Sequence, residues 1–222
     1  MSRKTGPKQA LFEQLAQIAA ALGSAARLEL LDFLAQSERS VDDLAKLTGL
    51  SVANTSKHLQ HLRRAGLVHG RREGLRVIYS MAGDDVMAAI MALRDLAESR
   101  LAEVDRIIAS YLASKDDLEP VSSDELMARA TEGLVTILDV RPPEEYAQEH
   151  LPGALNVPLG ELESHIATLP RDREIVAYCR GPWCVLSFEA VQLLRTAGYQ
   201  ARRLEGGLPE WRHEGRPTAS DH

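Results

Sequence analysis

Two cysteines, Cys179 and Cys184, are the residues of this 222-residue chain that could carry covalent chemistry. Residues 175–178 form a short apolar run that suits a buried strand, and residues 184–197 have the apolar spacing of a helix. A cysteine in the loop between such a strand and helix faces several backbone N–H groups that converge on one point. This field favours an anion, so we expect the Cys179 thiol to ionise readily and to react as a nucleophile.

The number and spacing of the cysteines exclude two other uses. Two cysteines five positions apart, with no others, cannot build the bridges of a small secreted domain or a four-cysteine zinc site. The first residues lead into an amphipathic stretch, and no apolar run is long enough to span a bilayer. We therefore expect a cytoplasmic protein with no membrane partner.

Charge is divided unevenly along the chain. The net charge is −6, yet residues 1–117 hold 16 Lys and Arg against 15 Asp and Glu, and residues 118–222 hold 10 against 17. Residues 46–76 contain a single acid, Glu73. The basic residues of this stretch are Lys46, Lys57, Arg63, Arg64, Arg71, Arg72 and Arg76. Basic charge concentrated in one short stretch is typical of a nucleic-acid binder.

This basic stretch lies in a pattern that predicts a helix-turn-helix followed by a hairpin. Helical spacing predicts helices over 8–22, 24–36, 41–47 and 52–65. Ser40 and Ser51 stand before the last two helices as N-caps, and the turn between those helices contains Gly49. Two short strands, over 67–70 and 76–79, then follow as a wing with residues 71–74 between them.

The rest of the chain predicts one long helix, a linker and a second domain. The apolar spacing of 84–112 predicts a single helix that needs a partner subunit to cover it. Polar residues and Pro120 predict a linker over 114–120, beyond which short strands alternate with helices. We therefore expect a mainly α winged-helix domain over 1–113 and an α/β domain with a mostly parallel sheet over 121–219.

Three stretches of the first domain resemble the ArsR-type winged-helix repressors. They are ALGSAAR at 21–27, LSVANTSKHL at 50–59 and RAGLV at 64–68. The resemblance covers residues 20–80 and agrees in spacing and residue type across three elements. It implies a homodimer joined through the first and last helices of the domain, with each recognition helix in a major groove of a double-stranded DNA operator.

The predicted recognition helix and wing supply the candidate DNA-binding residues. Outward-facing side chains at the start of a recognition helix read bases, while nearby positive charge holds phosphates. We expect Val52, Leu59 and Leu62 to face the core instead. The candidates for DNA contact are Ser51, Asn54, Thr55, Lys57, His58 and His61 in the helix and Arg71, Arg72 and Arg76 in the wing.

His58 and His61 raise the question of a metal site, because ArsR-type repressors often sense metals. One site of that family uses cysteines at the start of the first helix of the helix-turn-helix, where residues 40–44 contain no thiol. Another uses Asp and His on the last helix, and residues 84–112 contain no histidine. We therefore expect no metal and no cofactor, with both histidines facing DNA or solvent and the input arising elsewhere in the chain.

Four motifs in order resemble a single rhodanese domain over 121–219. They are DVR at 139–141 with EEY at 144–146, HLPGALNVP at 150–158, YCRG at 178–181 and GGLPEW at 206–211. In rhodaneses the cysteine attacks a sulfane-sulfur donor, becomes a persulfide and passes the sulfur to a nucleophile, and the resemblance gives this role to Cys179. The candidate catalytic residues are Cys179, Arg180, Gly181, Pro182, Trp183 and Cys184.

The neighbours of Cys179 have expected roles of their own. Arg180 would add positive charge near the thiol, and Trp183 would shield the loop. Asp139 and Arg141 would organise the scaffold rather than take part in chemistry.

The end of the loop departs from the common rhodanese pattern, since Cys184 and Val185 stand where a basic or small hydroxyl residue is usual. The related phosphatases need an arginine at the position of Val185, so we expect no phosphatase. Cys184 has two interpretations, which the sequence leaves open. It attacks a persulfide on Cys179 and closes a bridge, or it is a small buried side chain at the start of a helix.

Three functions follow from these features. The leading hypothesis is a DNA-binding regulator, a repressor by resemblance, whose rhodanese domain senses or carries reactive sulfur through a persulfide on Cys179. The second is a sulfurtransferase in which the winged helix serves mainly dimerisation. The third is a plain repressor with an idle rhodanese domain.

Overall fold

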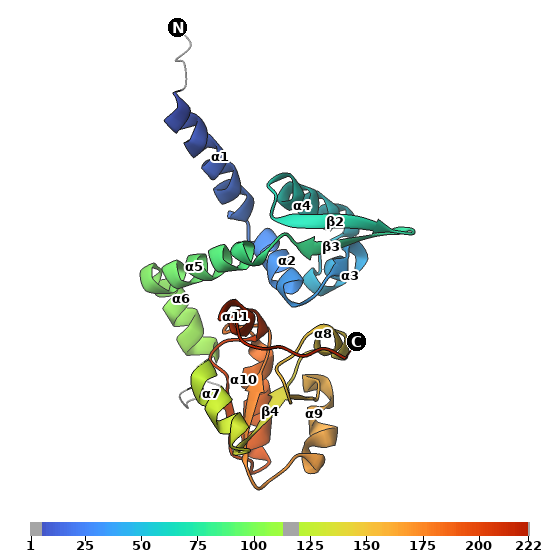
Figure 1. Cartoon of the computed structure of the whole chain (residues 1–222), viewed down its shortest axis with the longest axis vertical. Coiled ribbons are helices and arrows are strands. Elements are labelled where there is room, and N and C mark those ends of the chain that lie inside the picture. The colour runs from blue at the N-terminus through green and yellow to red at the C-terminus, as the bar shows by residue number, and fades with distance from the viewer. Residues whose placement is uncertain (1–5, 113–119, 222) are drawn as a thin grey trace. The chain divides into compact units, whose positions relative to one another are not determined.

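The computed structural model describes residues 6–112 and 120–221 (Figure 1). Most of the predicted linker, residues 114–119, lies outside the described residues, as do the first five residues. The chain divides into two compact units, Met1–Ile90 and Met91–His222. Among the described residues, no helix is both long and apolar enough to cross a membrane.

The first unit consists of helices and a small sheet around one apolar core. Its complete helices are α1 (Pro7–Leu22), α2 (Ala25–Gln36), α3 (Val41–Thr48) and α4 (Val52–Arg64). The hydroxyls of Ser40 and Ser51 cap α3 and α4 by accepting the backbone N–H groups of Asp43 at 3.1 Å and Asn54 at 3.3 Å. The predicted caps and helices of this region are therefore confirmed.

The wing of the first unit is longer than predicted. Its sheet has the order β1-β3-β2, built from β1 (Arg39–Ser40), β2 (Val68–Glu73) and β3 (Arg76–Met81), and both pairings are antiparallel. The interpretation of residues 71–74 as the connection was wrong, because β2 continues to Glu73, which pairs with Arg76. Gly74 adopts a φ of 58° and thereby permits a two-residue hairpin loop.

The single long helix predicted over 84–112 is interrupted. The chain forms α5 (Asp84–Arg100), α6 (Ala102–Ile107) and the short π-helix η1 (Ile108–Leu112). Between the first two, Leu101 is extended, with φ −111° and ψ 98°. Neither glycine nor proline stands there, so no local signal marks the break. The last turns of α5 before the break make tertiary contacts through Arg94 and Glu98.

The second unit is built on a four-stranded sheet in which all pairings between neighbouring strands are parallel. The strand order is β5-β4-β6-β7, with β4 (Val135–Asp139), β5 (Leu155–Asn156), β6 (Glu174–Tyr178) and β7 (Ala201–Arg203). The helices are α7 (Ser123–Thr131), α8 (Pro143–Gln148), α9 (Leu159–His165), the 3-10 turn η2 (Ile166–Thr168), α10 (Val185–Thr196) and α11 (Leu208–His213). The predicted α/β domain with a mostly parallel sheet is confirmed.

Side chains of β6 alternate between two apolar cores, as expected for a strand buried on both faces. Ile175 and Ala177 pack with residues of α9 and α10, and Cys179 continues this row. Val176 and Tyr178 pack on the other side with residues of α7 and α11. The alternation therefore places Cys179 on the face of the sheet that α10 covers.

Candidate functional site

The cysteine loop, residues 179–184, connects the end of β6 to the start of α10. The Cys179 side chain is 1% exposed, and that of Cys184 is half-buried. The two are joined by a disulfide, with their Cα atoms 6.3 Å apart. The N–H of Cys184 also donates to the carbonyl of Gly181 at 3.0 Å, so the loop turns back tightly before the helix begins.

A buried polar network lies beneath the strand ends that carry this loop. The Arg141 guanidinium donates to the Asp139 carboxylate, with Nη2 and Oδ2 2.7 Å apart and both side chains fully buried. The same carboxylate accepts a hydrogen bond from the Tyr178 hydroxyl. Burial and the Asp139 charge raise the pKa of Tyr178 well above its usual value, so the hydroxyl stays protonated as a donor. Asp139 and Arg141 therefore support the backbone next to Cys179.

The glycine at 207 brings a second segment against the loop. A Cβ at Gly207 would lie 2.6 Å from the carbonyl oxygen of Cys179, so only glycine fits there without a shift. The N–H of Gly207 donates to Oε2 of Glu210 at 2.9 Å. Leu208 completes the contact, with its N–H 3.4 Å from the same Cys179 oxygen. The segment 207–210 thus forms the floor of the cysteine loop.

Arg180 does not supply the free positive charge that was expected near the Cys179 thiol. Its guanidinium forms an ion pair with Glu145 of α8, with Nη2 and Oε1 2.8 Å apart, and the Glu145 side chain is fully buried. A buried carboxylate at this distance compensates the positive charge. Arg180 therefore ties the loop to α8 and adds little net positive charge near the cysteine pair.

Two side chains of α5 meet the second unit's loop region from outside the segment that resembles rhodaneses. Nη1 of Arg94 lies 2.7 Å from Oε1 of Glu210. The indole N–H of Trp183 donates to Oε1 of Glu98 at 2.7 Å, while 42% of Trp183 remains exposed. Trp183 therefore covers the cysteine loop only in part, and Glu98 holds the indole by its N–H group.

In the first unit, α4 presents most of the candidate DNA-binding side chains to solvent. Ser51, Asn54, Lys57 and His61 are exposed, and His58 is partly exposed. The prediction that Thr55 faces DNA was wrong, because its side chain is fully buried and its hydroxyl donates to the Ser51 carbonyl at 3.1 Å. The prediction for Val52 was wrong in the opposite sense, since 49% of it is exposed. The buried stripe of α4 consists of positions 55, 59 and 62.

The basic side chains of the wing are exposed, but they differ in their partners. Arg71 forms ion pairs with Glu38 and, at 2.8 Å, with Glu73. Nε of Arg72 donates to the carbonyl of Gly74 at 3.2 Å. Arg76 follows the hairpin loop and is exposed. Part of the positive charge of Arg71 is therefore compensated within the first unit.

Both halves of the chain match known families. Residues 24–69 match the family of bacterial regulatory proteins of the arsR type, and residues 122–214 match the rhodanese-like domain. The HTH-type transcriptional regulator Rv0324 of Mycobacterium tuberculosis is 43% identical over 218 residues, which are 98% of this chain and 96% of that protein. The chain belongs to the arsR family of transcriptional regulators. It is a regulator with a rhodanese-like domain.

Other proteins resemble one half of this arsR-family regulator. A sulfurtransferase of Allochromatium vinosum is 34% identical over 87 residues, which are 39% of the regulator and 79% of that protein. The homodimeric winged helix-turn-helix DNA-binding domain of Mb0332 from Mycobacterium bovis, solved in solution, is 40% identical. It covers 46% of the regulator and 94% of its own chain, with a TM-score of 0.41. The two resemblances inferred from the sequence are confirmed by the family matches.

The two histidines of α4 stand among positive charges in this regulator. Partial burial and the charges of Arg27, Lys57 and His61 lower the pKa of His58 below its usual value. Its imidazole is therefore neutral at neutral pH. In residues 6–112 and 120–221, no group of three or more His, Cys, Asp or Glu side chains is arranged to hold a metal ion.

The functional arrangement that the sequence did not reveal is the pair formed by Arg94 and Glu210. These residues are 116 positions apart, and Arg94 lies in a helix that the arsR resemblance assigns to dimerisation. Arg94 is not part of any sequence motif that would have marked it. Only the folded chain shows that Arg94, which belongs to the second compact unit, lies against the segment that supports the cysteine loop.

Proposed function

We propose that this arsR-family regulator is a sulfur-responsive repressor whose affinity for DNA changes when Cys179 is modified. The observation that supports the proposal is the Cys179–Cys184 bridge in the loop where rhodaneses bind sulfur. In this proposal, residues 1–113 bind DNA and dimerise, and residues 121–219 receive the signal. The proposal places the input in the second domain because residues 40–44 contain no cysteine and residues 84–112 contain no histidine.

The proposed input is a low-molecular-weight persulfide, R–S–S–H. The Cys179 thiolate attacks its outer sulfur, forms Cys179–S–S–H and releases R–S⁻. The Cys184 thiolate then attacks Sγ of Cys179, forms the disulfide and releases HS⁻. Two thiols are oxidised and the sulfane sulfur is reduced to sulfide, so the persulfide is the oxidant. A Cα separation of 6.3 Å is within the range that a disulfide spans.

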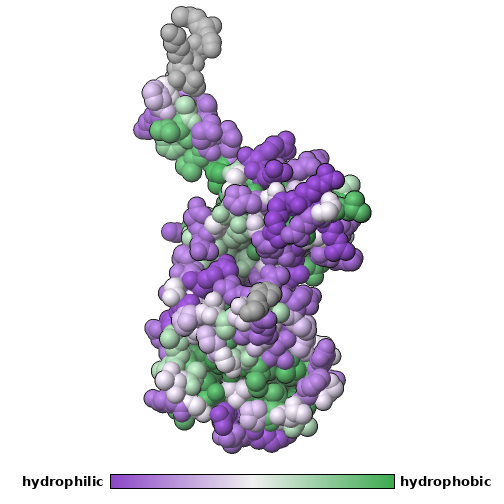
Figure 2. Space-filling view, turned by 45° about the vertical axis from the view of Figure 1, so that its right-hand side comes forward, coloured by the Kyte–Doolittle hydropathy of each residue, from purple (hydrophilic) through white to green (hydrophobic). Residues whose placement is uncertain are grey.

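The proposed DNA surface is the exposed side of α4 together with the wing. Asn54 and Lys57 lie on the first turns of α4 and are exposed, which is where a recognition helix reads bases and holds phosphates. Ser51, His58 and His61 lie beside them, and the wing adds Arg72 and Arg76. Figure 2 shows the hydrophilic character of this part of the first unit.

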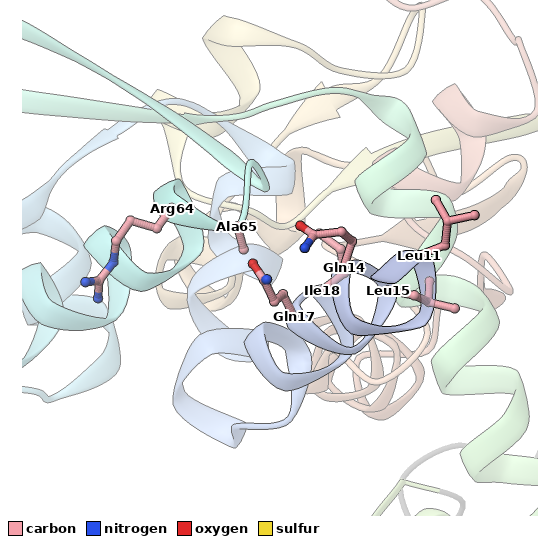
Figure 3. Close-up of a pocket in the computed structure, with 7 residues that line it drawn as sticks. All are labelled: Leu11, Gln14, Leu15, Gln17, Ile18, Arg64 and Ala65. Carbon is pink, nitrogen blue, oxygen red and sulfur yellow. The ribbon is translucent and has the colours of Figure 1, made fainter. Parts of the chain in front are cut away.

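The proposed homodimer uses the first helix. Leu11, Phe12 and Leu15 of α1 are 71%, 59% and 63% exposed, so α1 carries an apolar row that no described residue of the first unit covers (Figure 2). Beside this row lies a groove of about 440 Å³ between α1 and the end of α4, lined by Gln14, Gln17, Ile18, Arg64 and Ala65 together with the two leucines (Figure 3). Contiguous exposed apolar side chains of this kind mark protein interaction sites.

The test is operator affinity by fluorescence anisotropy at fixed salt, using DNA from upstream of the protein's own gene. The reduced protein and protein treated with a persulfide donor are compared for wild type, Cys179→Ser and Cys184→Ser. We expect treatment to change the affinity of wild type at least tenfold, about 1.4 kcal/mol, and to leave Cys179→Ser unchanged. Tight binding that is identical in all states would contradict the proposal and leave a plain repressor.

The second candidate function is sulfur transfer. The similarity to a sulfurtransferase over 87 residues favours it. Turnover of thiosulfate or a persulfide to cyanide by wild type, lost in Cys179→Ser, combined with no tight operator binding would establish this function instead. The bridging partner Cys184 argues against it, because closure of the disulfide competes with transfer of the persulfide sulfur to an external acceptor.

A further inference from the structure

Arg94 of α5 forms a nearly buried ion pair against the cysteine loop. Its Nη1 and Oε1 of Glu210 are 2.7 Å apart, and the two side chains are only 11% and 12% exposed. Glu210 holds the loop floor through its other oxygen, which accepts from the Gly207 N–H at 2.9 Å. A Cβ on Gly181 would lie 3.6 Å from both Glu210 oxygens and 3.8 Å from Nη1 of Arg94. The ion pair therefore borders the middle of the loop.

A second contact from the same helix reaches the loop at Trp183. The indole N–H donates to Oε1 of Glu98 at 2.7 Å, and the guanidinium carbon of Arg94 lies 5.3 Å from the centre of the indole ring. Arg94 and Glu98 are four positions apart, so they share one face of α5. One face of α5 thus contacts the loop at two places, through Glu210 beneath it and at Trp183 within it.

Arg94 brings a second guanidinium to the loop, and it too is paired with a carboxylate, that of Glu210. The loop's own cation, Arg180, is compensated by the buried carboxylate of Glu145. Neither Cys184, which ends the loop, nor Val185, which begins α10, is basic. Both charges of the Arg94–Glu210 pair are nearly buried and poorly screened by solvent. Removal of either partner therefore leaves a charge that acts on the nearby loop more strongly than a surface charge would.

We propose that Arg94 and Glu98 are positioning residues of the cysteine loop, and that Arg94, balanced by Glu210, sets how readily Cys179 ionises. The consequence for DNA binding rests on the proposed function. α5 begins in the core of the first unit, where Val86, Met87 and Ile90 are buried. Helix α5 is therefore the element through which a change in the loop reaches the DNA-binding half.

The test measures Cys179 reactivity in the full chain carrying Cys184→Ser, so that a single thiol remains. The second-order rate of iodoacetamide alkylation is followed from pH 5 to pH 10. Arg94→Gln removes the cation and leaves the Glu210 carboxylate uncompensated, and both changes disfavour a thiolate. We expect the rate at pH 7 to fall at least threefold and the midpoint of the pH profile to rise. Arg94→Lys should restore most of the rate.

A variant that removes the negative partner of the ion pair distinguishes an effect of charge from structural damage. Glu210→Gln keeps an acceptor for the Gly207 N–H but leaves the Arg94 charge uncompensated, so we expect alkylation at pH 7 to become at least threefold faster. Arg100→Gln, at the exposed end of the same helix, is the matched control and should leave the profile unchanged. Rates for Arg94→Gln and Glu210→Gln that both fall, or both stay within 1.5-fold of the parent, would overturn the proposal.

This assay contains no DNA, so its failure is distinct from a failure of the proposed function. A shifted alkylation profile with operator affinity identical in every cysteine state would keep the positioning role and reject the sulfur switch. An operator response to persulfide with unshifted alkylation profiles would do the reverse. Arg94→Gln combined with Glu98→Ala, in the chain with both cysteines, should lose at least two-thirds of the operator response.

Discussion

The hydroxyl of Tyr178 donates a hydrogen bond to the carboxylate of Asp139, its register partner on the neighbouring parallel strand. The same carboxylate holds the buried guanidinium of Arg141. The Tyr178 oxygen in turn accepts the N–H of Leu151 at 3.1 Å. The hydroxyl of the residue immediately before Cys179 is thereby held by two hydrogen bonds, one donated and one accepted, which keeps the start of the cysteine loop in place.

Tyr178→Phe should lower the free energy of unfolding by about 1–3 kcal/mol, because it removes a hydrogen bond to a charged group and leaves the buried Leu151 N–H without its acceptor. Urea unfolding of the reduced full chain measures this difference. Tyr199→Phe, another nearly buried tyrosine of the second unit that bonds only backbone carbonyls, is the matched control and should cost less. Equal costs would show that the Asp139 contact adds nothing.

Gly207→Ala should distort the cysteine loop, because the new Cβ would lie 2.6 Å from the Cys179 carbonyl oxygen. We expect a loss of stability of about 1–3 kcal/mol from overpacking, and slower alkylation of Cys179. Gly160→Ala in α9 is the control, since a Cβ there meets nothing within 4 Å, and it should be neutral or stabilising. A Gly207→Ala protein with wild-type stability and reactivity would contradict the close contact.

The stability of the second unit should fall in acid through Glu174. Burial acts to raise the pKa of this carboxyl, but hydrogen bonds from Arg202 and Arg129 prevail and lower the pKa below its usual value. A lowered pKa means that its stabilisation is complete above the unfolded value, about 4.3, and is lost as the pH falls through the folded value. The stability difference between wild type and Glu174→Gln should therefore be largest at pH 6–7 and should shrink below about pH 4. Urea unfolding across this range would reveal a constant difference if the ion pairs contribute nothing.

Lys57 and Thr55 lie two positions apart on α4, and we expect substitutions at the two positions to affect different properties, DNA binding and stability. Lys57 is exposed, so Lys57→Ala should weaken operator binding, reduce its salt slope by about 1, and leave stability unchanged. Thr55 is fully buried, so Thr55→Val should lower stability by about 1 kcal/mol without changing the salt slope. Anisotropy titrations at several salt concentrations and urea unfolding separate the two. A salt slope altered by Thr55→Val would argue against this assignment of faces.

Leu15→Asp should dissociate the proposed homodimer, because it introduces a charge into the exposed apolar row of α1. Analytical ultracentrifugation should show a shift to monomer. Leu75→Asp at the tip of the wing, where the leucine is fully exposed, is the control and should keep the wild-type mass. A Leu15→Asp protein that sediments like wild type would place the interface elsewhere.

Local patterns predicted the parts of this fold that local interactions hold. The caps at Ser40 and Ser51 act within three residues, and the apolar spacing of β6 and α10 reflects burial that any partner surface satisfies. The faces of α4 were partly misassigned because the buried stripe runs through Thr55 and not Val52. A hydroxyl that bonds its own helix backbone can be buried, and polarity alone does not show this.

What the sequence alone determined is the assignment of both halves to their families, the helix-turn-helix and the position of Cys179 at the end of a buried strand, since each rests on residue types at short, fixed spacing. Only the tertiary structure decided the break at Leu101, the compensation of Arg180 by Glu145 and the pairing of Arg94 with Glu210. These last contacts join residues 35 and 116 positions apart. Charged side chains at such separations carry no periodic signal, because their partners are chosen by how strands and helices pack rather than by their neighbours in the chain.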